Sequence, residues 1–342
     1  MRLLFILVFF SFLAYADLST QKVWKDYKER FIEPSGRIID PHNNNVTHTE
    51  GIGYALYFAY KMNDDETFRK VYQWGKQNIK LNGYELPGWK WGKNKHKNCW
   101  CMLDMTSATD ANLWIAYSLL LMYDKTGNSE YKHKADEIVD SIKKHQIVYT
   151  RKGEVYLFPY EKEIMDDDEW KLNPSYLIFE IFEYLAEYDS DPVWNKLIKS
   201  SKIFLKRTRF SALQLNPDWV TYKPYADRFV LEKEYQNFGF DAIRVPLYIL
   251  RSNLSVTQKK ELLLPYKYYV QMMRTQPLGV VKLKDGLISM YDFSFGNVAV
   301  YRYIARFYGY DYSLFDKILE NRIKQYNEDY YAYSLYLLTI LH

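Results

Sequence analysis

Three short segments of the 342-residue chain each place an acidic residue in front of a stretch with the apolar spacing of a helix. These segments are His48-Thr49-Glu50-Gly51-Ile52-Gly53-Tyr54, Ser107-Ala108-Thr109-Asp110 and Phe240-Asp241-Ala242-Ile243-Arg244-Val245-Pro246. Each acid therefore lies at the N-terminal end of a different expected helix, and Glu50 stands beside a Gly-x-Gly turn. Carboxyl groups that share one cleft can serve as general acid and general base, so the recurrence indicates an acid–base site.

Four segments, taken together, resemble glycoside hydrolase family 8, the inverting endo-glucanases. The first has Thr49 where the family commonly has serine, and Trp114 is a departure where family members commonly carry another acid. The segments follow the family order over most of the chain. They are Thr49-Glu50-Gly51-Ile52-Gly53-Tyr54, Ser107-Ala108-Thr109-Asp110 with Ile115-Ala116-Tyr117, Asn173-Pro174-Ser175-Tyr176, and Asp241-Ala242-Ile243-Arg244-Val245-Pro246.

The resemblance implies a general acid at Glu50, a general base at Asp241 and a sugar contact beside the scissile bond at Asp110. It also implies hydrolysis with inversion, in which the base activates a water on the face opposite the protonated oxygen. A helix N-terminus favours an anion, so burial under aromatic rings and the charge of Asp110 are the influences that would keep Glu50 protonated. Arg244, one helical turn beyond Asp241, is expected to hold that carboxylate in place.

Helix capping is the competing interpretation of the three acids. Thr47 with Glu50, and Ser107 with Asp110, fit the capping box, and Asp241 fits a plain N-cap. Capping does not require the further family residues that accompany the acids, and these favour catalysis. His48 has no partner set for nucleophilic catalysis, and a positioning hydrogen bond is its ordinary alternative.

Aromatic residues make up 18% of the chain, and most of the 34 tyrosines are expected in the core. Better candidates for stacking on flat sugar rings lie off the expected helices, in Gly88-Trp89-Lys90-Trp91-Gly92 and in Cys99-Trp100-Cys101. The family places a tryptophan of a Trp-x-Trp-Gly segment in the glycan cleft. Trp91 matches this tryptophan best, with packing on the barrel as the alternative. Trp89, two positions earlier, is a further substrate-binding candidate. The weaker substrate-binding candidates are Tyr176, Trp219 and Tyr291, and Arg244 is grouped with the substrate-binding residues.

Apolar residues recur at helical spacing in about twelve segments. These are 20–32, 51–62, 66–80, 108–125, 129–146, 174–188, 191–207, 241–252, 256–273, 296–308, 312–324 and 328–341. The pattern predicts an all-α chain, and the resemblance implies that the helices form an (α/α)6 toroid. Residues 153–158 and 280–283 are the few expected strands, on connections at the rim.

The start of the chain is typical of a signal peptide, with Arg2, an apolar run and the small residues Ala14 and Ala16 before an expected cleavage site. Residues 1–16 are therefore expected to be removed, and 17–342 to form one domain without an appended binding module. No later stretch approaches the roughly 20 apolar residues of a membrane helix. The formal charge of +4, from 46 basic and 42 acidic residues, predicts no nucleic-acid partner.

Cys99 and Cys101 are too close along the chain to form a structural framework, so they are interpreted as two thiols, with a local disulfide as the alternative. A zinc site would need more ligands than nearby His96 supplies. The acidic run from Asp166 to Glu169 is interpreted as a solvated rim loop, with binding of Mg²⁺ or Ca²⁺ as the alternative. Hydrolysis by two carboxylates requires no metal and no cofactor.

These observations predict a periplasmic or secreted endo-β-1,4-glucanase that cuts a cellulose-like polymer. Its size and export signal resemble the family members that accompany bacterial cellulose synthesis, so an exopolysaccharide synthesis complex is a possible partner. Other family members act on chitosan, xylan or mixed-linkage glucan. A non-catalytic glycan-binding subunit of an export machine is the alternative from another class, and a lyase or epimerase on a similar toroid is a third.

Overall fold

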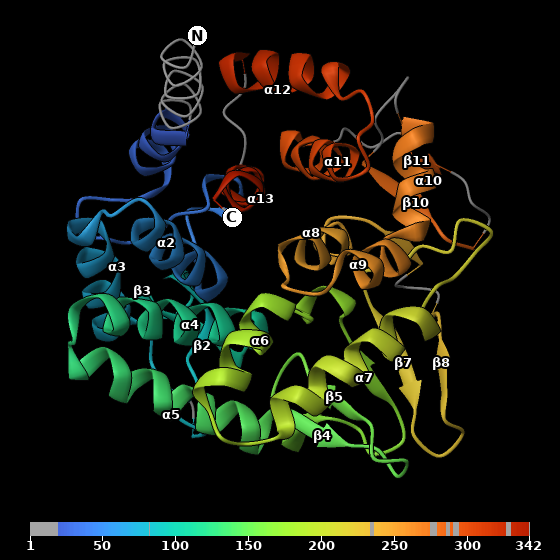
Figure 1. Ribbon diagram of the computed structural model, residues 1–342. Coiled ribbons are helices and arrows are strands. Elements are labelled where there is room, and N and C mark those ends of the chain that lie inside the picture. Colours follow the sequence, from blue (N-terminus) through green and yellow to red (C-terminus); the bar gives the residue numbers. More distant parts are fainter. Residues whose placement is uncertain are drawn as a thin grey trace, which may run out of the picture.

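Six helices form the inner ring of a barrel in the computed structural model, which describes residues 20–81, 83–232, 236–273, 279–284, 288–289, 294–325 and 330–341. The six are α2 (Thr49–Lys61), α4 (Thr109–Thr126), α6 (Phe179–Tyr188), α8 (Arg244–Arg251), α11 (Phe295–Phe307) and α13 (Tyr330–Ile340). Each contacts the next, and α13 returns to α2, so the ring is closed (Figure 1). The expected signal peptide, 1–16, lies outside the described residues.

An outer layer of helices packs around this ring (Figure 1). It consists of helical residues 20–31, α3 (Asp65–Asn78), α5 (Ser129–His145), α7 (Val193–Arg207), α9 (Val256–Leu262) with α10 (Leu264–Met273), and α12 (Ser313–Gln325). Burial explains the two layers, because the inner α2 buries residues around its whole circumference, whereas the outer α3 buries one stripe. The predicted all-α fold of paired helices in an (α/α)6 toroid is confirmed.

Two of the predicted helices are interrupted in the structure. The segment 256–273 divides at Leu263 into α9 and α10, because Pro265 has no N–H to donate and its ring obstructs the preceding turn. The segment 174–188 begins as a short 3₁₀ turn, η3 (Pro174–Tyr176), before α6 starts at Phe179. The side chain of Asn173 accepts a hydrogen bond from the N–H of Ser175, and this bond stabilises the turn that follows the preceding strand.

Short strands are more numerous than the sequence analysis predicted, and the described ones form four small sheets. The predicted strands at 153–158 and 280–283 are present as β5 and β10. The hairpin of β2 (Gly88–Asn94) and β3 (Cys99–Ser107), which pairs with β1 (Thr47–His48), was not predicted. The remaining elements are η1 (Pro41–Asn43), β4 (Ile147–Tyr149), β5 (Val155–Leu157), η2 (Lys162–Ile164), β6 (Trp170–Leu172), β7 (Val220–Lys223), β8 (Arg228–Val230), β9 (Asn237–Phe238), β10 (Val280–Lys282) and β11 (Ile288–Ser289).

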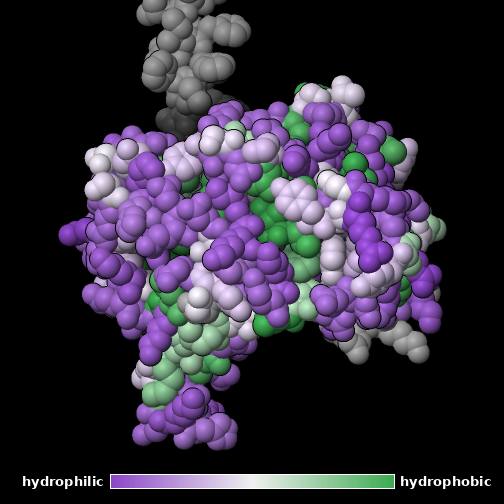
Figure 2. All heavy atoms as spheres, turned by 90° about the horizontal axis from the view of Figure 1, so that it is seen from below, coloured by the Kyte–Doolittle hydropathy of each residue, from purple (hydrophilic) through white to green (hydrophobic). Residues whose placement is uncertain are grey.

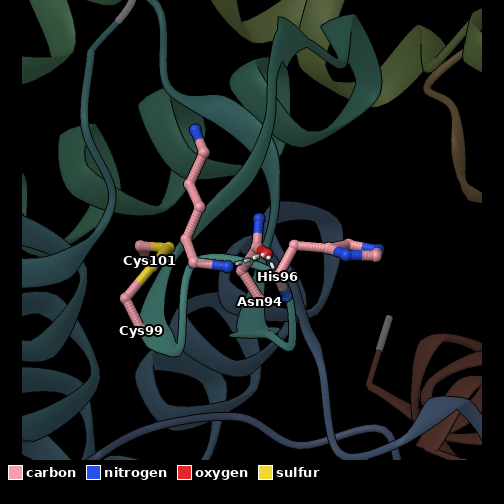
Figure 3. Close-up of a disulfide and its surroundings, with 5 residues drawn as sticks. Asn94, His96, Cys99 and Cys101 are labelled. Carbon is pink, nitrogen blue, oxygen red and sulfur yellow. Dashed lines mark hydrogen bonds between the residues drawn. A yellow bond between two sulfur atoms is a disulfide. The ribbon is translucent and has the colours of Figure 1, made fainter.

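Cys99 and Cys101 are joined by a disulfide at the start of β3 (Figure 3). The interpretation as two thiols is therefore wrong, and the alternative of a local disulfide is correct. The surface of the molecule is mostly hydrophilic on the face that Figure 2 shows, with hydrophobic residues gathered in a central band and on one projection. None of the described helices combines the length and apolar character needed to cross a membrane.

A buried arginine ties the inner helices together at the end of the barrel opposite the acids. Arg251, at the end of α8, donates to Glu180 of α6 at 2.9 Å and to the Tyr57 hydroxyl of α2 at 2.6 Å. It also donates to the carbonyl of Leu338 in α13. These partners compensate the buried charge and connect three inner helices to α8, so no isolated ion is left in the core.

Candidate active site

The three acids predicted from the sequence meet at one mouth of the barrel. Glu50 lies in the first turn of α2, Asp110 in the first turn of α4, and Asp241 just before α8, which is on the other side of the ring. The guanidinium of Arg244 joins all three. Its Nη2 donates to Asp241 Oδ1 at 2.8 Å, and its Nη1 donates to Asp110 Oδ2 at 3.0 Å and to Glu50 Oε1. The predicted contact of Arg244 with Asp241 is confirmed, and its contacts with the other two acids are new.

The glycines beside Glu50 lie inside α2, so the predicted Gly-x-Gly turn is not present. Their role is close packing. A Cβ on Gly53 would lie 2.7 Å from the Cβ of Trp114 in α4, and one on Gly51 would lie 3.2 Å from the ring of Tyr330. The small residues thus let α2 approach both neighbouring inner helices and bring Glu50 to the centre of the mouth.

Capping does not explain these acids. The N-cap residues of α2 and α4 are His48 and Ala108, and neither makes a side-chain capping bond. Thr47, which the capping box would use, instead donates to the carbonyl of Ile38 at 2.6 Å. The carboxylate of Asp241 accepts hydrogen bonds from the side chains of Asn173, Trp219 and Arg244, and not from the backbone N–H groups that begin α8. The carboxyl groups are therefore directed at the mouth of the barrel and at each other.

Glu50 is surrounded by groups that keep its carboxyl group neutral. Burial raises its pKa to about 8, the charges of Asp110 and Asp241 add to the rise, and Arg244 opposes it. The hydroxyl of Tyr54, which donates to Glu50 Oε1 at 3.1 Å, also opposes the rise of this pKa. The combined effect is a carboxylic acid that still holds its proton near neutral pH, as a general acid must.

Asp241 has a different environment from Glu50. Its side chain is 36% exposed, whereas that of Glu50 is 17% exposed and that of Asp110 is 3% exposed. Oδ2 accepts the indole N–H of Trp219 at 3.0 Å and the amide of Asn173 at 3.4 Å. Three donors therefore hold this carboxylate in position while part of it stays open to water, as a general base that activates water requires.

A fourth acid, Asp218, holds the loop that carries Asp241. Its Oδ1 accepts the backbone N–H groups of Gly239 at 3.0 Å, Asp241 at 3.1 Å and Ala242 at 2.7 Å. A Cβ on Gly239 would lie 2.6 Å from Asp218 Oδ2, so a larger residue there would displace this carboxylate. Burial, and then the charge of Asp241, raises the pKa of Asp218 to about 7. The sequence analysis missed Asp218, because it precedes Asp241 by 23 positions and belongs to no helical pattern.

The acids open into a cavity of about 300 Å³ with aromatic walls. Trp89 and Tyr176, two of the predicted substrate-binding residues, line it, and so does His48, whose ring stacks on Trp89 with centroids 5.4 Å apart. The predicted positioning bond of His48 is present, since Nε2 lies 3.3 Å from Asp40 Oδ2. The other residues of the lining are Thr49, Glu50, Ala108, Asp110, Phe240, Asp241, Arg244, Tyr330 and Tyr331.

Trp91, the preferred stacking candidate, is absent from the lining of this cavity and packs on the barrel, which was its alternative. Neighbouring residues of a strand point to opposite faces, so Thr47 points away from the cavity that His48 lines. Trp91 pairs with Thr47 in the sheet and packs edge-on against Trp74 of α3, with centroids 5.1 Å apart. Irregular pairing of β2 with β3 on either side of Lys90 breaks the alternation of the strand.

The other candidates are placed as follows. Trp219 supports Asp241 and is absent from the lining of the cavity, and Tyr291 lies outside the described residues. Trp114 is fully buried, and its N–H donates at 3.4 Å to Tyr248, whose hydroxyl lies 2.9 Å from that of Tyr54. The departure from the family at Trp114 thus falls in the packing beneath Glu50, not in a substrate contact.

The acidic run from Asp166 to Glu169 lies in an exposed, irregular connection and not in the cavity. Glu169 pairs there with Lys223, and Asp166 accepts the N–H of Asp168 at 2.8 Å. In the part of the chain that the structure describes, no three histidine, cysteine or acidic side chains converge in a way that could hold a metal ion.

A buried acid of raised pKa and a more exposed acid that face one aromatic-lined cavity are the arrangement that a glycoside hydrolase uses. Comparison with known proteins agrees with this class. The model of the glycosyl hydrolases family 8 matches residues 1–342, and the chain belongs to that family.

Individual proteins that are similar to this chain are endoglucanases. An endoglucanase of Cellulomonas uda is 30% identical over 281 residues, which are 82% of this chain and 76% of that protein. An endoglucanase of Escherichia coli K12 is 28% identical over 251 residues, which are 72% of this chain and 67% of that protein. The crystal structure of a GH8 endo-β-1,4-glucanase from an Achatina fulica gut metagenomic library superimposes with a TM-score of 0.81 at 28% identity, over 93% of this chain and 95% of that one.

Proposed function

We propose that this glycoside hydrolase is an endo-β-1,4-glucanase that cuts a cellulose-like β-glucan with inversion. The observation that carries the proposal is the convergence of Glu50, Asp110 and Asp241 on Arg244 in one aromatic-lined cavity. Family membership and the endoglucanase names of the relatives support the reaction and the polymer.

In this proposal Glu50 is the general acid and Asp241 the general base. Glu50, with a pKa of about 8, protonates the glycosidic oxygen as that bond breaks. Asp241 removes a proton from a water that attacks the anomeric carbon from the opposite face. The two carboxyl groups contact different nitrogens of the Arg244 guanidinium, so that side chain spaces them apart and leaves Asp241 open to water.

Asp110 and the aromatic walls hold the sugar. Asp110 is the most buried of the three acids, its charge helps to keep Glu50 protonated, and its carboxylate lines the cavity, where a sugar hydroxyl group would contact it. The flat faces of β-linked glucosyl rings pack against Trp89 and Tyr176, whose polar atoms bind hydroxyl groups. Chitosan would favour further acids near the cavity, and the run from Asp166 to Glu169 does not supply them.

Export to the periplasm or the medium is part of the proposal. The signal-peptide pattern of residues 1–16 supports it, and so does the Cys99–Cys101 disulfide, since disulfides persist in oxidising compartments. A role beside an exopolysaccharide synthesis complex rests only on size and export signal, and co-purification from the source cell tests it.

The test of the reaction is release of reducing ends from carboxymethyl-cellulose, mixed-linkage β-glucan, xylan and chitosan. Wild type, Glu50→Gln and Asp241→Asn are assayed in parallel with Glu29→Gln, whose side chain is 63% exposed in the outer layer. We expect turnover by wild type and Glu29→Gln only, with binding retained by Glu50→Gln. Absence of release by every protein, with binding retained, would favour the glycan-binding subunit. An unsaturated or epimerised product would favour a lyase or epimerase.

Stereochemistry is tested separately, by NMR of the first products released from a soluble β-linked oligosaccharide. Inversion predicts that the α-anomer accumulates before mutarotation. Early appearance of the β-anomer would exclude Asp241 as a base that activates water and would require a covalent intermediate.

A further inference from the structure

The hairpin of β2 and β3 carries a second aromatic group, on the flank that faces away from the cavity. Trp100 is 52% exposed, and its ring stacks on that of Trp91 with centroids 5.4 Å apart and planes 23° apart. Trp91 in turn packs against Trp74 of the outer helix α3. The three rings therefore lead from the outer layer of the barrel to a tryptophan that is open to water.

A buried arginine holds these rings in place. The guanidinium of Arg37 lies 4.7 Å from the ring centroid of Trp91 and 4.7 Å from that of Trp100. The side chain of Arg37 is only 8% exposed, and its Nε donates to the hydroxyl of Thr47 at 3.1 Å. A fixed cation against both rings restricts the motion of Trp100 even though half of its surface is exposed.

The Cys99–Cys101 disulfide encloses Trp100 alone, since the two cysteines are separated by two positions. Stabilisation of the whole fold by a disulfide grows with the length of the loop that it closes, so this one contributes little to global stability. Its effect is local, on the backbone of Trp100. Figure 3 shows the disulfide on one side of the hairpin turn, with the side chain of His96 directed to the other side.

The surroundings of Trp100 fit a carbohydrate better than a protein. One exposed ring is far smaller than the roughly 800 Å² that each partner buries in a stable protein interface. Lys93, which pairs with Trp100 in the sheet, and Lys95 and Lys97 in the turn are exposed donors for hydroxyl groups. A flat sugar ring presents C–H groups to an indole face and hydroxyl groups at its edge, which matches a ring with donors beside it.

We propose that Trp100 is a platform outside the catalytic cavity that binds a second stretch of the β-glucan substrate. The ligand class rests on the proposed function. Trp89, on the same strand β2, lines the cavity, so one hairpin would hold the polysaccharide on both of its flanks. Anchoring of this kind would raise the local concentration of an insoluble polymer at the cavity without contributing to bond cleavage.

Adsorption to insoluble cellulose tests the platform without requiring catalysis. The proteins are wild type, Trp100→Ala and the matched control Tyr149→Ala, whose aromatic ring is also 52% exposed and also lies beside a cation, Lys196. We expect the partition coefficient of Trp100→Ala to fall about three- to tenfold, from the usual contribution of one stacked ring, and that of Tyr149→Ala to stay at the wild-type value. Thermal unfolding of each variant shows whether the fold is intact, and Trp100→Phe, which keeps a ring, should recover part of the binding.

Hydrolysis of a soluble oligosaccharide by the same proteins separates the platform from the cavity. We expect kcat/KM to be the same in Trp100→Ala as in wild type. Equal adsorption of Trp100→Ala and wild type, or no adsorption of wild type, would overturn the proposal. So would an equal loss of soluble turnover and adsorption in Trp100→Ala, because Trp100 would then belong to the cavity. Absence of all hydrolysis by wild type would refute the proposed function and leave the adsorption result decisive for the platform.

The contribution of the disulfide is measured with the Cys99→Ser, Cys101→Ser double variant, which retains Trp100. We expect its partition coefficient to lie between those of wild type and Trp100→Ala, with little change in the unfolding midpoint. Binding equal to wild type would show that Arg37 and Trp91 alone hold the ring, and would remove the disulfide from the proposal.

Discussion

Glutamine in place of Glu50 should make the protein more stable while it abolishes turnover. The substitution keeps the shape of the side chain and imitates the protonated acid. In wild type, ionisation of Glu50 puts a third negative charge beside Asp110 and Asp241, and among the described residues Arg244 is the one cation that contacts all three. The variant cannot ionise in either state, so it has no cost of taking up a proton on folding, or of burying the charge above pH 8.

The magnitude follows from the linkage between proton binding and folding. Burial raises the pKa of Glu50 from 4.5 to about 8, so between these pH values the folded state retains a proton that the unfolded state has lost. The stabilisation from this group is complete below pH 4.5 and disappears as the pH rises through 8. At about 1.4 kcal/mol per pH unit, wild type loses on the order of 5 kcal/mol through Glu50, and Glu50→Gln loses none of it.

The assay is urea unfolding of wild type, Glu50→Gln and the exposed control Glu29→Gln at pH 5 and pH 8, with free energies from linear extrapolation. The difference between Glu50→Gln and wild type should increase by several kcal/mol from pH 5 to pH 8. The difference between Glu29→Gln and wild type should stay constant. A Glu50→Gln curve that runs parallel to wild type would refute the reasoning, because it would mean that Glu50 is ionised in the folded protein at both pH values.

Three further results are expected. The kcat/KM of wild type on a soluble β-glucan should fall above about pH 8, where Glu50 loses its proton, and a profile that stays flat to pH 10 would exclude it as the acid. Asp218→Ala leaves three backbone N–H groups without their acceptor, so the free energy of unfolding should drop by about 3 kcal/mol, and kcat should fall more than KM changes. Asp218→Asn keeps an acceptor oxygen, so its losses in stability and in kcat should be smaller. Equal kinetics of the two variants would show that Asp218 is a purely structural residue. Trp89→Ala should raise KM up to about tenfold, whereas Trp91→Ala should lower the unfolding midpoint and leave KM unchanged. A rise of KM in Trp91→Ala but not in Trp89→Ala would place Trp91 in the cavity.

The sequence determined the helices and the identity of the acids, because both depend on local patterns. Apolar spacing reports which side of a segment is buried, and it located the helices of both layers. Short motifs marked Glu50, Asp110 and Asp241 at helix starts, and the spacing of Asp241 and Arg244 predicted their contact. Where prediction failed locally, one residue explains it, as with Pro265 between α9 and α10.

Only the tertiary structure decided how these residues act on each other. Closure of the ring brings α8 across from α2, so Arg244 reaches Glu50 over a separation of 194 positions that no local pattern encodes. Asp218 acts through backbone N–H groups, which every residue except proline carries and which therefore leave no mark in a sequence. The choice between Trp89 and Trp91 depends on strand pairing and its irregularities, because a shift of one residue moves a side chain to the other face of a sheet. Burial, which raises the pKa of Glu50, is likewise a property of the assembled barrel.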